Sequence, residues 1–418
     1  MSRYQLSWII LPLCMVLYSC KSSEEFTGYA YDPEGVTNTS DKEIQPQHKR
    51  TIGRSEEGIW ISNEFKGARM NDFYKVDKSL YRVVIEPENH PINNSPWYAF
   101  KIHSESPRTV QLQLSYRHGE HRYHPNISRD GNHWRTMDPS AIQVDTAGVA
   151  TLTLDLDGDP LWISAQELLT YRDMTQWMDS IRTASPTVVD TVGYSHRRYP
   201  ILKMTTAPKP RDQKQGVLVI TGRQHPPEVT GGLASRIFIE TLTADTRLAR
   251  AFRKAFEIWS YPLVNPDGVN GGHWRHNAAG VDLNRDWKNF NQPETRAIRD
   301  DLLTLRNDPN RKVYYGIDFH STNENIFYPI NRDITTFPDD FTYKWIEELK
   351  NSFPEMPLKV EPFPPNSPIA KNWIYHTFGA DALTYEVDDR ADRSQLREIS
   401  RQAAQILMQN LLEAKSQQ

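Results

Sequence analysis

The chain contains 418 residues, a length that exceeds one typical domain and predicts two or three structural units. Its 49 basic and 53 acidic residues leave a formal net charge of −4, which excludes the strongly basic surface of a nucleic-acid-binding protein. Charged residues make up 24% and aromatic residues 11% of the sequence, as expected for a folded protein with a substantial core rather than a disordered chain.

The N-terminus has the features of an export signal. Its two cysteines, Cys14 and Cys20, are the only ones in the sequence, so no disulfide framework is available. Arg3 precedes an apolar run over residues 8–17 that is too short to span a bilayer. Residues 17–20, Leu-Tyr-Ser-Cys, resemble a bacterial lipobox. The resemblance implies cleavage before Cys20 and acylation of its thiol; the alternative is a plain signal peptide with an incidental cysteine.

We therefore expect residues 1–20 to be a lipoprotein signal peptide and residues 21–52 to be a flexible tether, because the latter segment is polar and offers little that could support a core. The lipidated chain would be an exported bacterial lipoprotein, anchored to a membrane through Cys20 and facing the periplasm or the cell surface.

Residues 53–180 are predicted to form a small antiparallel β-sandwich. Apolar and polar residues alternate there with a period of two, as in strands that bury one face. Turn residues separate the alternating segments, and a sandwich is the usual way for several such strands to bury their apolar faces. Strands are expected around residues 80–85, 97–102, 109–115 and 151–156.

Residues 181–418 are predicted to form an α/β domain, set apart by a polar stretch over residues 183–191. Continuous apolar strands followed by segments of period 3.6 are typical of a sheet covered by helices on its faces. Strands are expected at residues 216–220, 258–263, 313–319 and 382–387, and helices after Glu228, Pro293, Pro338 and Ser394.

Residue types with catalytic chemistry gather at the ends of these strands, where open α/β sheets place their sites. His225 and Glu228 follow the first strand, and an imidazole and a carboxylate at this spacing suit one Zn²⁺ ion, although the spacing alone is common by chance. The other motifs are Trp274-Arg275, Asp282-Leu283-Asn284-Arg285, Asp318-Phe319-His320-Ser321 and Thr384-Tyr385-Glu386. Each alone has an ordinary structural explanation, but their order and their positions favour a site.

This ordered set resembles the zinc carboxypeptidases of the carboxypeptidase A fold, over about residues 216–389. The resemblance implies a mixed-sheet catalytic domain, one Zn²⁺ per chain, and hydrolysis of the C-terminal bond of a peptide or protein. It further implies the following roles: His225, Glu228 and His320 as metal ligands, Glu386 as general base, Arg275 as the group that stabilises the oxyanion, Asn284 and Arg285 as the binders of the substrate's terminal carboxylate, and Asp282 as the carboxylate that orients the first ligand histidine.

A finer resemblance is to the cytosolic carboxypeptidase branch, in which a β-sandwich directly precedes the catalytic domain. Residues 95–100, Ser-Pro-Trp-Tyr-Ala-Phe, and residues 123–125, Tyr-His-Pro, carry it. By this resemblance, counting back from Glu386, Lys371 falls where the family has the side chain at the base of its specificity pocket, and a cation there implies a substrate that ends in Glu or Asp. The alternative is that Lys371 is a solvated helix residue.

Two departures from the family pattern bear on specificity. Pro364 stands where a mobile tyrosine that clamps the substrate is expected, so either a neighbour such as Tyr375 substitutes or the terminal carboxylate is held differently. Pro227 replaces an arginine that often precedes the ligand glutamate. Two other functions stay open: an aspartoacylase-like zinc amidohydrolase that cleaves small N-acyl amino acids, and a peptide-binding module without catalysis.

Overall fold

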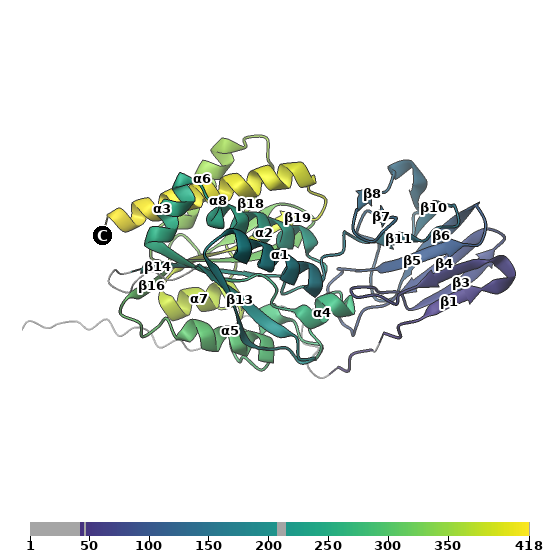
Figure 1. Cartoon of the computed structure of the whole chain (residues 1–418), viewed down its shortest axis with the longest axis horizontal. Coiled ribbons are helices and arrows are strands. Elements are labelled where there is room, and N and C mark those ends of the chain that lie inside the picture. The colour runs from purple at the N-terminus through teal and green to yellow at the C-terminus, as the bar shows by residue number, and fades with distance from the viewer. Residues whose placement is uncertain (1–41, 46, 207–214, 418) are drawn as a thin grey trace, which may run out of the picture.

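The computed structural model describes residues 42–45, 47–206 and 215–417. The predicted signal peptide with Cys20, and most of the predicted tether, lie outside the described residues. Within the described ranges, no helix has both the length and the apolar character needed to cross a bilayer. The described chain forms a β-sandwich followed by a larger α/β unit (Figure 1).

The sandwich consists of a six-stranded and a five-stranded sheet. In spatial order the first contains β1 (Thr51–Arg54), β2 (Ile59–Ser62), β5 (Ala99–Ser104), β11 (Leu161–Ser164), β7 (Asn126–Ser128) and β8 (Arg135–Thr136). The second contains β3 (Asp72–Asp77), β4 (Leu80–Ile85), β6 (Arg108–Tyr116), β10 (Ala150–Leu156) and β9 (Ile142–Val144). The alternating leucines predicted to share a buried face do so, since Leu112 pairs with Leu152 and both are fully buried. The predicted antiparallel sandwich is confirmed except that β4 and β6 run parallel, because the intervening β5 lies in the other sheet.

The α/β unit is built on an eight-stranded sheet. Its spatial order is β12 (Thr187–Tyr194), β13 (Pro200–Thr206), β15 (Phe256–Tyr261), β14 (Gln215–Gly222), β16 (Arg311–Thr322), β19 (Asp381–Asp388), β17 (Ile326–Pro329) and β18 (Lys359–Val360). The central strands β15, β14, β16 and β19 are parallel, while β13 and β17 join them antiparallel, so the sheet is mixed as predicted. The polar stretch expected to separate the two units contains β12, which is polar because it is an edge strand with one solvated side.

Helices cover both faces of this sheet. They are α1 (Tyr171–Ala184), α2 (Val229–Thr243), α3 (Arg247–Ala255), α4 (Pro266–Gly271), α5 (Pro293–Leu303), α6 (Phe341–Ser352), α7 (Ala370–Phe378) and α8 (Arg393–Ser416). The helices α2, α3 and α6 pack with the long α8 on one face, and α5 and α7 lie on the other (Figure 1). The boundary expected between residues 180 and 181 falls inside α1, which packs against β12 and α4.

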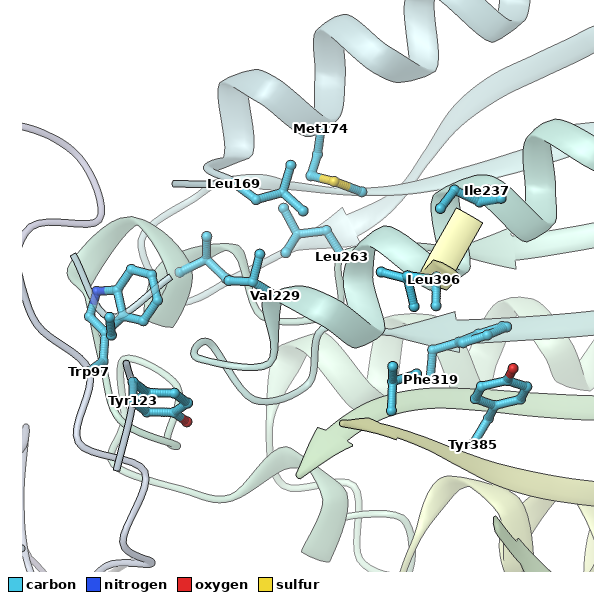
Figure 2. Packing of buried hydrophobic residues seen from close by; sticks show 14 of the residues in the cluster. Trp97, Tyr123, Leu169, Met174, Val229, Ile237, Leu263, Phe319, Tyr385 and Leu396 are labelled. Atoms are coloured by element: carbon cyan, nitrogen blue, oxygen red, sulfur yellow. The ribbon is translucent and has the colours of Figure 1, made fainter. Parts of the chain in front are cut away.

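The two units share a continuous hydrophobic core. Trp97 and Tyr123 of the sandwich belong to the same buried cluster as Val229 at the start of α2 and Leu263 after β15 (Figure 2). Trp97 and Tyr123 are 4% and 3% exposed, so the surface between the units is buried from solvent. Burial of large aromatic groups at this junction fixes the sandwich against the end of the α/β unit that carries the chemical motifs.

Candidate metal centre and substrate pocket

Two histidines and a glutamate converge at the carboxyl ends of the central parallel strands. His225 lies in the loop after β14, Glu228 is the N-terminal cap of α2, and His320 lies near the end of β16. Because β14 and β16 are paired and parallel, the residues that follow one strand lie beside the end of the other. The ligand atoms of the three residues all lie within 4.8 Å of one another, and all three are buried.

Each histidine is held between two carboxylates. The Nδ1 atoms of His225 and His320 lie 2.7 and 2.8 Å from the two carboxylate oxygens of Glu228. On the opposite side of each ring, Nε2 of His225 lies 2.9 Å from Asp282 Oδ1, and Nε2 of His320 lies 2.7 Å from Asp318 Oδ2. The outer carboxylates therefore fix both rings with their Nδ1 atoms turned toward a common point.

The carboxylates around the two histidines make this cluster a favourable place for a cation. Burial lowers the pKa of His320, but the charges of Asp318 and Glu228 outweigh it and raise that pKa well above its usual range. Burial likewise raises the pKa of Glu228, but His225 and His320 hold it well below its usual range. Two imidazoles and one carboxylate, backed by further carboxylates, are the donor set of a three-ligand zinc site. The residues present therefore fit Zn²⁺.

A glycine permits the helix to approach the metal centre. Gly231 lies in the first turn of α2, directly against the backbone of β16. A Cβ atom added at this position would lie 2.3 Å from the carbonyl oxygen of His320. The close packing of Glu228 against His320 thus depends on the missing side chain of Gly231.

Glu386 lies on β19, next to the metal centre. In the parallel pairing of β16 with β19, Glu386 stands directly opposite His320. Its Oε2 atom is buried and makes no hydrogen bond within the described residues. Burial, reinforced by the charge of Glu228, raises the pKa of Glu386 to about 8. Such a carboxyl group is suited to exchanging protons near neutral pH.

Asp282 links the metal centre to the predicted substrate-binding residues. One of its oxygens contacts His225, and the other accepts a hydrogen bond from Arg275 Nε at 2.6 Å. Asp282 also begins the short 3-10 turn Leu283–Arg285, and it accepts a hydrogen bond from the backbone N–H of Asn284 at 2.8 Å. A single buried carboxylate therefore orients a metal-ligating ring, a guanidinium group and the turn that bears Arg285.

These residues open into one pocket of about 230 Å³. Its lining includes all three candidate ligands and the predicted residues Glu386, Arg275, Asn284 and Arg285. Three further lining residues, Asn93, Ser95 and Arg122, come from the sandwich. Arg122 also forms an ion pair of 2.6 Å with Asp389, three residues beyond Glu386. The pocket is therefore built by both units.

The structure corrects the position predicted for Lys371. This residue is fully buried in α7, its Nζ donates to the carbonyl oxygen of Pro329 at 2.9 Å, and it does not line the pocket. Burial lowers its pKa to about 7. Tyr375, suggested as a substitute clamp, is also absent from the lining, whereas Tyr328 and Phe363 are present. Of α7 and its caps only Ile369, the N-cap residue, lines the pocket, so counting along the chain did not locate a pocket residue.

Two residues around the site, Asp318 and Arg122, were not assigned a role from the sequence. Asp318 was within a recognised motif, and the period-two alternation of strands would have placed it on the same side of β16 as His320. The sandwich residue Arg122 had no such signal, because it reaches the pocket from more than a hundred residues away in the sequence. Contacts of that range are decided by how the two units pack.

Comparison with known proteins gives a consistent result. The sequence profile described as zinc carboxypeptidase matches residues 174–407. Cytosolic carboxypeptidase 6 of Mus musculus is 30% identical over 127 residues, which cover 29% of this chain and 24% of the mouse protein. Cytosolic carboxypeptidase 6 of Caenorhabditis elegans is 25% identical over 204 residues, which cover 46% of this chain and 44% of the worm protein. The chain thus spans less than half the length of these curated relatives.

Solved structures share the fold over both units. A metallo-carboxypeptidase from Burkholderia cenocepacia superposes with a TM-score of 0.69 at 18% identity, covering 86% of this chain and 99% of that one. A metallo-carboxypeptidase from Pseudomonas aeruginosa, in complex with (2-guanidinoethylmercapto)succinic acid, has a TM-score of 0.68 at 19% identity, covering 85% of this chain and 99% of the other. At these identities the likeness establishes the architecture.

Proposed function

This chain belongs to the zinc carboxypeptidase family, and from that premise we propose that it hydrolyses the C-terminal peptide bond of a peptide or protein. One observation carries the proposal. The candidate base Glu386 stands opposite the candidate ligand His320 on adjacent strands, in the same pocket as Arg275. Pure peptide binding needs no carboxyl group beside a metal centre whose oxygen is buried without a hydrogen-bond partner among the described residues, so this arrangement favours catalysis over a binding module.

The family's metal is zinc, one ion per chain, and His225, Glu228 and His320 are the residues that would hold it. When bound, the ion supplies Lewis acidity toward the scissile carbonyl oxygen and the attacking water. Glu386 would accept a proton from that water and deliver it to the leaving amine. The guanidinium group of Arg275, fixed by Asp282, would stabilise the negative charge that develops on the carbonyl oxygen.

The proposal that the enzyme cleaves at the C-terminal end of its substrate rests on the turn that follows Asp282. Arg285 offers a planar fork that binds a carboxylate through two parallel hydrogen bonds, and Asn284 adds a further polar contact. Both side chains line the pocket. Tyr328 lies in the same lining, and burial together with the charge of Glu386 raises its pKa to about 12, which keeps the phenol protonated as a hydrogen-bond donor. We assign to Tyr328 the clamping role that Pro364 cannot fill.

We also propose a preference for an acidic C-terminal residue. Its support is the charge of the lining, which carries three arginines against two glutamates. Because one of these glutamates is a ligand of the divalent ion in this proposal, the groups that face the pocket carry more positive than negative charge, which favours an anionic side chain. Asp282 and Asp389 pair with Arg275 and Arg122 from behind the lining. We assign this contact to Arg122, which lines the pocket although its guanidinium group is also paired with Asp389, whereas the buried Lys371 gives no support.

We propose further that the enzyme acts outside the cytoplasm as a membrane-anchored bacterial lipoprotein. The support is the sequence of residues 17–20, in which Cys20 would carry the acyl chains, together with the polar segment over residues 21–52 that would serve as a tether. Its test is metabolic labelling with a fatty acid: label should be incorporated by the wild-type chain and lost in Cys20→Ala.

The activity is tested on the chain that begins after Cys20, by measuring zinc content and release of C-terminal residues from a panel of peptides. We expect one zinc per chain and chelator-sensitive release, fastest for peptides that end in Glu or Asp. Hydrolysis of N-acetylaspartate without release from any peptide would identify the amidohydrolase instead. Failure to bind zinc from a metal-replete buffer would leave only a binding role.

A further inference from the structure

The loop that carries Arg275 is held by the sandwich. One carboxylate oxygen of Glu88 accepts a hydrogen bond from the backbone N–H of Trp274 at 2.7 Å. The other accepts from the backbone N–H groups of Arg275 and His276, at 3.0 and 2.7 Å. A single side chain of the first unit thus binds three consecutive backbone donors of the second, from 186 to 188 residues away in the sequence.

This contact is buried. Glu88, Trp274 and His276 have no exposed surface or almost none. Burial raises the pKa of Glu88, but His273, His276 and Arg69 outweigh it and lower that pKa to about 2. A buried carboxylate is costly unless its oxygens accept hydrogen bonds, and here both oxygens accept from backbone N–H groups, three in all. The ionised side chain of Glu88 and the backbone N–H groups of the loop therefore each need the other as a hydrogen-bond partner.

Neighbouring sandwich residues fix the loop at other points. Asn89 Oδ1 lies 2.6 Å from Nδ1 of His276, and Asn89 Nδ2 donates to the carbonyl oxygen of Gly280 at 3.1 Å. The indole N–H of Trp274 donates to the carbonyl oxygen of Trp97 at 3.0 Å. The segment from residue 274 to residue 280 is thus attached to the sandwich on both sides of Arg275.

The backbone held by Glu88 is connected through side-chain contacts to the candidate metal ligands. The main chain of Arg275 is fixed by Glu88, and its guanidinium group is fixed by Asp282 at 2.6 Å. Asp282 in turn contacts the ligand ring of His225 at 2.9 Å. The contacts therefore form an unbroken chain from a sandwich carboxylate to the metal centre.

We propose that Glu88 is a positioning residue for catalysis, which sets the place of the Arg275 guanidinium by clamping the backbone of its loop. The sandwich is then a working part of the active site rather than an attached module. This inference rests on the function proposed above. It assigns no contact with the substrate to Glu88, which acts only through Arg275.

Glu88→Gln is the informative substitution, because it changes the shape of the side chain very little. Glutamine has one acceptor oxygen, so its amide N–H₂ must face at least one of the three backbone N–H groups. Whichever way the amide turns, at least one buried donor loses its partner. Glu86→Gln is the matched control, since Glu86 lies two residues away and its half-buried carboxylate forms an ion pair with the exposed Arg117 rather than with the loop.

The experiment is a double-mutant cycle on peptide release with Arg275→Ala. In the wild-type background we expect Glu88→Gln to lower kcat roughly 10- to 100-fold, with KM and zinc content unchanged. In the Arg275→Ala background the same change should alter kcat by no more than about twofold, because no guanidinium remains to be positioned. Glu88→Asp, which keeps the charge but shortens the reach, should give an intermediate kcat and serves in the same cycle if Glu88→Gln does not fold.

A second readout does not need activity: backbone amide exchange of residues 274–276, which should accelerate in Glu88→Gln and stay unchanged in Glu86→Gln. Equal losses of kcat in both backgrounds would reduce Glu88 to a structural role and overturn the inference, as would unchanged exchange. A wild-type chain that released no residue from any peptide would refute the proposed function, and the exchange experiment would still decide whether Glu88 clamps the loop.

Discussion

Replacing Gly231 by alanine should damage the metal centre specifically. Gly231 lies three residues after the ligand Glu228, where the first turn of α2 meets β16. The new Cβ atom would lie 2.3 Å from the carbonyl oxygen of His320 and 2.5 Å from its carbonyl carbon. Both atoms belong to the backbone of a central strand, so they cannot rotate away as the end of a side chain would.

The size of the effect follows from these distances. Ordinary contact begins near 3.4 Å, so the helix and the strand must separate by about 1 Å. Metal sites hold their ligand distances within about 0.2 Å, and this separation would move Glu228 relative to His320 by several times that tolerance. We expect zinc affinity to fall at least about 100-fold. The free energy of unfolding of the metal-free chain should fall by about 1 to 3 kcal/mol, as for other overpacked interiors.

Competition with a chelator of known affinity measures the first quantity, and denaturant unfolding of the metal-free chain measures the second. Gly222→Ala is the control, because an added Cβ atom at this buried position near the site meets nothing closer than 3.7 Å. Wild-type zinc affinity in Gly231→Ala would show that helix and strand relax without moving the ligands, and the reasoning would then be wrong.

Three further substitutions test other parts of the structure. Burial lowers the pKa of Lys371 to about 7 from 10.5, so the unfolded chain binds the extra proton between these values and stability rises with pH across that window. Lys371→Met should therefore raise the free energy of unfolding at pH 7 by roughly 3 kcal/mol and flatten its rise toward pH 10; an unchanged pH profile in denaturant titrations would contradict this. Glu386→Gln should keep its zinc yet lose about 100- to 10 000-fold in kcat, and near-normal peptide release would remove this residue from the role of base. Asp318→Asn should weaken zinc binding about 10- to 100-fold by freeing the outer nitrogen of His320; chelator titration that matches the wild type would exclude that role.

Much of the fold could be read from local patterns. The strand predicted at residues 216–220 is β14, Gln215–Gly222, and the one predicted at residues 313–319 is β16, Arg311–Thr322. Period and hydrophobicity report burial on one or both faces, and that is what these strands have. The boundary drawn at residue 180 cut through α1, because the polar stretch on which it rested begins at the end of that helix and continues into the polar edge strand β12.

Some residues of the candidate site could likewise be predicted from local patterns, and others could not. His225 and His320 could be found from the sequence because each directly follows or ends a buried strand, and the ends of parallel strands meet. Lys371 was misplaced because one residue along a helix turns a side chain by about 100°, so counting cannot tell which side chains a helix buries in the core.

The sequence by itself determined the chemistry of this protein: the donor types, their attachment to strand ends, and the family to which the chain belongs. Only the tertiary structure decided that Arg122 lines the pocket and that Glu88 clamps the backbone of Arg275. The physical reason is the separation along the chain of the residues that interact. Strand ends are ordered by hydrogen bonds between neighbouring strands, which leave a periodic trace in the sequence, whereas the junction of two units depends on shape and burial between segments that share no local pattern.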